Sequence, residues 1–146
     1  MKKTFVKRVL ALSCAVVLCI GCAITASAAS KTSTTGNFST NYGTFKGTLN
    51  CARGTSTAAA TASTSCHFDD YSSPYPPKLY AEVELQHWSS GNTIATDRKT
   101  ATNSTGVSTN TVSGSASSYV TAWGSHILYN SSGSQLLKKG TQTVKV

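Results

Sequence analysis

The densest group of side chains that could do chemistry is the run His67, Phe68, Asp69 and Asp70. Its imidazole and two carboxylates suit a divalent cation, and His87 could join them from a later strand. The spacing matches neither a zinc motif nor an EF-hand loop. Because aspartates commonly cap turns, we favour that role for Asp69 and Asp70. The alternative is a metal-dependent hydrolase built on four residues: His67, Asp69, Asp70 and His87.

Other patterns that would indicate an enzyme are missing from the sequence. It contains no G-x-S-x-G, no H-E-x-x-H and no P-loop. Glu82 and Glu84 fall on one face of an expected strand, so we expect both to be solvated rather than to flank a cleft as glycosidase carboxylates do. His126 lies within another expected strand and is expected to be structural. The expectation is a protein that is not an enzyme and needs no cofactor.

Four aromatic residues make the best case for a binding surface. They lie in pairs on single faces of two expected strands, at 79–88 and 119–130: Tyr80, Trp88, Tyr119 and Trp123. If exposed, they would form a flat platform able to stack on sugar rings or on a peptide. A small domain with few large apolar residues is expected to bury Trp123, which would remove the platform from its strand. Tyr80 and Trp88 are expected to stay partly exposed.

The elements that must position these residues are strands. From residue 36 to residue 146 the chain is rich in Ser and Thr, alternates apolar and polar residues, and has turn signals every 8 to 12 residues or so. Seven or eight short strands are expected, with 93–102 pairing antiparallel to 79–88. The pattern predicts a single antiparallel β-sandwich, Ig-like or related, with a small β-barrel as the alternative. Residues 29–35 are expected to be a disordered lead-in.

The first 28 residues are typical of a bacterial export signal. A basic start precedes an apolar run from Val9 to Ile24, and Ala26-Ser27-Ala28 supplies a small-residue cleavage site. The run is shorter than the roughly 20 residues of a membrane-spanning helix. Residues 1–28 are therefore expected to be cleaved, which leaves a secreted protein that does not span a membrane. The alternatives are an uncleaved anchor and a lipoprotein modified at Cys22.

Removing this segment changes both the charge and the cysteine count. The whole chain carries a formal net charge of +8, whereas residues 29–146 hold nine basic and five acidic residues, a net charge of +4 that does not indicate nucleic-acid binding. Cys51 and Cys66 remain, and in an exported protein such a pair predicts a disulfide; two thiols are the alternative. In a simple hairpin these cysteines would lie too far apart, so a disulfide requires the second strand to bend or to change sheets.

These observations favour an exported, non-enzymatic binding module outside the cell or at the bacterial surface. Its expected partner is a cell-wall glycan or a surface protein, bound through the aromatic residues. A secreted antimicrobial or toxin-like effector is an alternative that suits a small cationic protein. The modest charge and the lack of an amphipathic helix count against it.

Overall fold

The computed structural model describes residues 29–68 and 74–146. Within these residues the chain forms ten strands: β1 (Ala29–Thr34), β2 (Phe38–Thr40), β3 (Gly43–Arg53), β4 (Thr57–His67), β5 (Lys78–His87), β6 (Thr93–Thr102), β7 (Gly106–Ser108), β8 (Val112–Ser115), β9 (Val120–Tyr129) and β10 (Gln135–Thr143). None of the described residues belongs to a helix long and apolar enough to cross a membrane.

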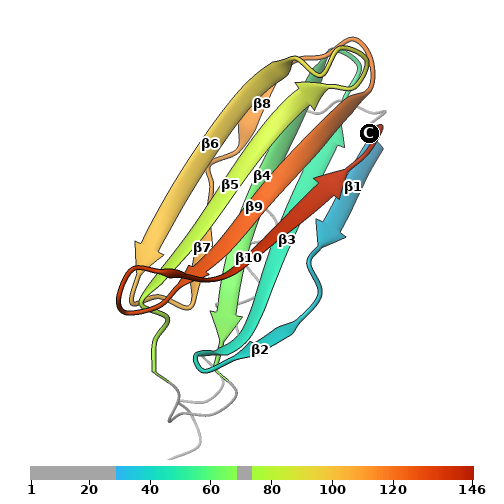
Figure 1. Cartoon of the computed structure of the whole chain (residues 1–146). Helices are drawn as coiled ribbons and strands as arrows, with labels where there is room; N and C mark the ends of the chain where they lie inside the picture. Colours follow the sequence, from blue (N-terminus) through green and yellow to red (C-terminus); the bar gives the residue numbers. More distant parts are fainter. Residues whose placement is uncertain (1–28, 69–73) are drawn as a thin grey trace, which may run out of the picture.

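The strands form two antiparallel sheets that pack face to face (Figure 1). One sheet has the order β1-β3-β4-β7, with β2 beside β3 and β8 beside β4, and the other has the order β10-β9-β5-β6. The predicted sandwich is thus confirmed at the level of two packed sheets. The barrel alternative is wrong, because the described strands make two separate sheets. The predicted pairing of 93–102 is also confirmed, since β6 has these bounds and pairs antiparallel with β5.

The core consists of two apolar clusters with a polar layer between them. The first cluster includes Leu49, Cys51, Ala60, Ala62, Val83, Leu85, Val120, Ala122 and Val146. The second consists of Phe45, Cys66, Leu79, Ala81, Val107 and Leu128. Between them lie Gly47 on β3, Thr64 on β4 and His126 on β9, of which Thr64 and His126 are fully buried. A hydrogen-bonded polar layer of this kind is tolerated in a core only where its groups find partners.

The outward position of Trp123 corrects the expectation that it would be buried. Trp123 is 45% exposed, whereas Val120, Ala122 and Leu128 on the opposite face of β9 are fully buried. Because residues alternate between the faces of a strand, burying the aliphatic face turns the indole to solvent. The core has no need of the indole, since Phe45 from β3 and the leucines of β5 and β9 fill it.

The predicted disulfide between Cys51 and Cys66 is wrong for this fold. β3 and β4 form a regular hairpin in which Cys51 lies opposite Ala60 and Cys66 lies opposite Phe45. Six residues of extended strand separate Ala60 from Cys66, about 20 Å at roughly 3.3 Å per residue. A disulfide needs Cα atoms within about 7 Å. The two buried cysteines are therefore not bonded to each other.

The expected disorder of residues 29–35 is also wrong for most of that segment. Residues 29–34 form β1, which pairs with β3 from Ala29 opposite Arg53 to Thr34 opposite Thr48. The ammonium of Lys31 donates a 2.6 Å hydrogen bond to the carbonyl of Val144, which ties β1 to the end of the chain. Thr is a favoured strand residue, and pairing satisfies the outer edge of β3. The expected signal segment, residues 1–28, lies outside the described residues.

Candidate functional site

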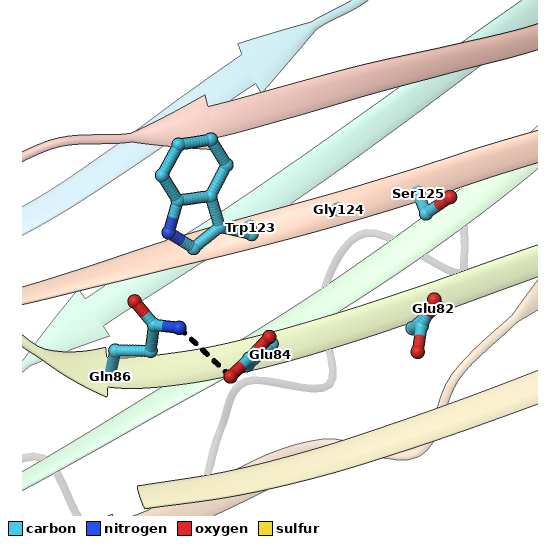
Figure 2. A pocket seen from close by; sticks show the side chains of 6 residues that line it. All are labelled: Glu82, Glu84, Gln86, Trp123, Gly124 and Ser125. Atoms are coloured by element: carbon cyan, nitrogen blue, oxygen red, sulfur yellow. Dashed lines mark hydrogen bonds between the residues drawn. The ribbon is translucent and has the colours of Figure 1, made fainter. Parts of the chain in front are cut away.

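A shallow groove of about 420 Å³ lies on the outer face of the second sheet, over β5 and β9 (Figure 2). Its lining residues are Glu82, Glu84, Gln86, Trp123, Gly124 and Ser125. The three residues from β5 alternate along one face of that strand, and the residues from β9 meet them from the neighbouring strand. The site therefore lies on the outward face of two interior strands, where the side chains that line it point away from the core.

The pairing register of β5 and β9 determines which groove residues face each other. Trp123 lies opposite Glu84, and Ser125 lies opposite Glu82. Directly opposite side chains have Cβ atoms about 4.5–5.5 Å apart, and Figure 2 shows the Trp123 indole and the Glu84 carboxylate on the same outer face, with the indole ring extending towards the Gln86 end of the groove. On the far side of β9, Gly140 of β10 faces Ser125 and contributes no side chain. One wall of the groove is thus aromatic and the other is acidic.

The Glu84 carboxylate is held in place by two donors. The amide Nε2 of Gln86 donates a 2.8 Å hydrogen bond to Oε1, and the hydroxyl of Thr93 on β6 donates to the same oxygen. The Thr93 hydrogen bond, followed by that of Gln86, lowers the pKa of Glu84 below its ordinary value, against a smaller opposing effect of burial. Glu84 is therefore an oriented anion at neutral pH, and its second oxygen remains available to a ligand.

Tyr80 continues the outer face of β5 beyond Glu82, which marks one end of the groove. Glu82 faces Arg98 across the β5–β6 ladder, and Tyr80 faces Ile127 of β9. Burial raises the pKa of the Tyr80 phenol to about 12, with a hydrogen bond to Glu82 and its negative charge adding to the effect. Tyr80 lies four residues from Glu84, about 13 Å along the strand. It is therefore separated from the Trp123 side chain rather than stacked beside it.

Trp88 and Tyr119 lie at the end of the sandwich and do not line the groove. They are 44% and 48% exposed, and the backbone N–H of Trp88 donates a 3.0 Å hydrogen bond to the Tyr119 carbonyl. The Tyr119 ring packs against two cations, with Arg53 Cζ 5.2 Å and Lys145 Nζ 5.0 Å from its centroid. Of the four aromatic residues proposed as a platform, only Trp123 lines the groove.

The two histidines of the metal site suggested by the sequence lie far apart. His67 ends β4 and pairs with Thr44, whereas His87 ends β5 and pairs with Val120 at the opposite end of the sandwich. The length of β5 separates these ends by about 30 Å. Asp69 and Asp70 lie outside the described residues. Within residues 29–68 and 74–146, no group of three or more metal-ligating side chains comes together.

His126 is a structural residue, as the sequence suggests. It is fully buried, with Nδ1 2.9 Å from Thr64 Oγ1 and Nε2 2.9 Å from Thr141 Oγ1. The Thr64 hydroxyl donates to the Tyr80 carbonyl at 2.7 Å, so it accepts from Nδ1–H, and Nε2 accepts from Thr141. Burial lowers the pKa of His126 to about 4. A neutral imidazole sealed in the core has no access to a substrate.

Comparison with models of protein families, with curated proteins and with solved structures found no match. The site is therefore interpreted from its own chemistry. An exposed aromatic face, two carboxylates, an amide and a hydroxyl suit a ligand that is rich in hydrogen-bond donors and has a flat apolar face. The alternation of Glu82, Glu84 and Gln86 was the signal in the sequence, but only the pairing of β5 with β9 brings Trp123 to it.

Proposed function

We propose that this chain is an exported, non-enzymatic module that binds a glycan of the bacterial surface in the groove beside Trp123. The observation that carries the proposal is the exposed indole of Trp123 opposite the oriented carboxylate of Glu84. A sugar ring offers an apolar face that stacks on an aromatic ring and hydroxyl groups that donate to carboxylates. The signal-like segment at residues 1–28 supports export.

A glycan suits this groove better than an extended peptide does. Peptides that bind to sheets commonly add a strand to an exposed edge, where the main chain supplies the hydrogen bonds. The groove lies over β5 and β9, and both strands are already paired on both sides. Their backbone groups are therefore unavailable to a peptide at this place. A ligand must be recognised by side chains alone, and the lining residues here are those that recognise rings and hydroxyl groups.

The carboxylates of the groove support binding rather than hydrolysis. A glycosidase needs an acid whose pKa is raised, facing a second carboxylate across the scissile bond. Here Thr93 and Gln86 lower the pKa of Glu84 and keep it ionised. Glu82 and Glu84 project side by side from one strand instead of facing each other across a cleft. These features fit a site that accepts hydrogen bonds and leaves the glycosidic bond intact.

We also propose that the sandwich is Ig-like in its connectivity. The order β10-β9-β5-β6 matches the G-F-C-C′ arrangement of one Ig sheet, and β3 and β4 then take the places of A and B. β7 and β8 pair with β4 as a divided E strand would. In this scheme β1 is an added strand beside A. The groove then lies on the open face of the C and F strands.

The proposal is tested by binding of the purified protein to insoluble bacterial cell-wall glycan and to soluble polysaccharides. Wild type is expected to bind at least one of these glycans, and Trp123→Ala is expected to lose most of that binding. Trp88→Ala is the matched control, because it removes an indole of equal exposure that does not line the groove. If no glycan binds, or if Trp123→Ala binds as tightly as wild type, the proposal is wrong.

A further inference from the structure

The groove is built almost entirely from hydrogen-bond acceptors. Both described donors to Glu84 end on its Oε1, which leaves Oε2 facing the groove. Gln86 uses its amide nitrogen on Glu84, so its oxygen remains as an acceptor. Glu82 adds a carboxylate, and the Ser125 hydroxyl can accept as well as donate. Such a lining favours a ligand that supplies hydrogen-bond donors.

The charge of the groove is opposite to that of the chain around it. Residues 29–146 carry nine basic and five acidic residues, yet the groove lining holds two glutamates and no lysine or arginine. Across the β5–β6 ladder Arg98 faces Glu82, whereas Glu84 faces Thr96. Glu84 is therefore the carboxylate without a cation opposite it in the sheet. This local negative charge complements a ligand that carries a positive one.

The indole of Trp123 adds a second attraction for the same ligand. A cation close to an aromatic face is attracted by the ring quadrupole, and tryptophan is the strongest of the aromatic side chains in this respect. An ammonium group between Trp123 and Glu84 would meet both at once, because the two side chains lie directly opposite each other. An ammonium group has only three N–H donors. The acceptor oxygens of Glu82, Gln86 and Ser125 therefore offer more hydrogen bonds than the ammonium group alone can make. Hydroxyl groups on the same ligand would use them.

We propose that the groove binds a sugar residue with a free amine, its ammonium group on Glu84 and one face of its ring on Trp123. This inference rests on the proposed glycan-binding function and narrows its ligand to an amino sugar whose nitrogen is not acetylated. Acetylation removes the positive charge and adds bulk at the nitrogen. A neutral sugar has hydroxyl donors but no cation for Glu84.

The experiment measures binding of four probes to the mature protein by titration calorimetry at low salt. The probes are β-1,4-linked tetramers of glucosamine, N-acetylglucosamine and glucose, and a tetralysine peptide. Wild type is expected to bind the glucosamine tetramer about tenfold or more tightly than the other three, as the loss of one charged hydrogen bond implies. Binding is expected to weaken as salt screens the charges.

Two variants separate what the Glu84 carboxylate and the Trp123 indole each contribute to ligand binding. Glu84→Gln is expected to abolish the preference for the free amine, and Trp123→Ala to weaken binding of every sugar. Asp97→Asn is the control, since it removes one negative charge from β6 outside the groove lining and should preserve the preference. Circular dichroism shows whether each variant is folded.

The outcomes distinguish this inference from the function on which it rests. If all three sugar tetramers bind equally and Trp123→Ala weakens them, the glycan function stands and the amine preference is overturned. If tetralysine binds more tightly than the glucosamine tetramer, the ligand is a basic peptide and the inference fails. If none of the three sugar tetramers binds, this inference fails, and the glycan function is then decided by the binding test with insoluble cell-wall glycan and polysaccharides.

Discussion

The imidazole of His126 occupies the space in front of Gly47, on the facing strand of the other sheet. A Cβ atom built on Gly47 would lie 2.3 Å from Cγ of His126, and one built on Gly124 would lie 2.4 Å from Thr141 Oγ1. The two sheets thus approach each other at a layer where glycines make room for a hydrogen-bonded histidine. This layer divides the two apolar clusters of the core.

Gly47→Ala is expected to destabilise the fold by about 1–3 kcal/mol, because the imidazole must leave its hydrogen bonds to accommodate a methyl group. Urea denaturation measures the change in the free energy of unfolding. Gly106→Ala is the control, since its Cβ would come no closer than 3.7 Å to the Thr64 carbonyl oxygen. Equal stability of the two variants would show that the ring moves aside at little cost.

Stability is expected to fall as the pH drops from about 6.5 towards about 4. The pKa of folded His126 is lowered by burial to about 4, below the unfolded value of about 6.5. Its contribution is therefore complete above pH 6.5 and is lost as the pH falls, by about 3 kcal/mol in all. Chemical denaturation across this range measures the slope. In His126→Gln the free energy of unfolding should depend less on pH in this range. An unchanged dependence would mean that other groups cause it.

Thr93→Val is expected to raise the pKa of Glu84 towards its ordinary value, because the valine cannot donate to Oε1. A titration of the Glu84 carboxyl carbon by NMR measures this directly. Because the pKa of Glu84 is lower in the folded than in the unfolded chain, its carboxylate stabilises the fold at pH values above the unfolded pKa. This stability is lost as the pH falls through the folded pKa. Thr96→Val is the matched control, since Thr96 faces Glu84 on β6 without being one of its donors. A shift of equal size in both variants would contradict the assignment to Thr93.

Adding a reductant is expected to leave the melting temperature unchanged. The β3–β4 register holds Cys51 and Cys66 about 20 Å apart along the hairpin. Thermal unfolding with and without dithiothreitol measures this, and loss of a disulfide closing such a loop would lower stability by about 3 kcal/mol. A clear fall in melting temperature would mean that β4 does not pair with β3 in this register.

Trp123→Ala is expected to lower the free energy of unfolding by about 1 kcal/mol or less, because nearly half of its side chain is exposed. Leu128→Ala, five residues along the same strand but in the core, is expected to cost about 2–5 kcal/mol. Urea denaturation of the two variants compares the faces of β9. Similar losses in both would place Trp123 in the core after all.

Much of the fold could be predicted because apolar and polar residues alternate regularly in this chain and turn residues separate the strands. The strand at 93–102 and its pairing with β5 follow from alternation and from the turn before it. The short strand β2 and the Ser/Thr-rich β1 could not be found this way. Both are held by pairing with β3 rather than by an apolar pattern of their own.

The sequence by itself determined the two-faced strands, the separation of Cys51 from Cys66 within any hairpin, and the row of Glu82, Glu84 and Gln86 on one face. Only the tertiary structure decided which face of β9 is buried. Alternation allows either face of a strand to point inwards, and the choice depends on what the opposing sheet supplies. Here Gly47 leaves space for the His126 imidazole in the core and Thr64 hydrogen-bonds to it. Trp123, on the other face of β9, therefore faces solvent and lines the groove.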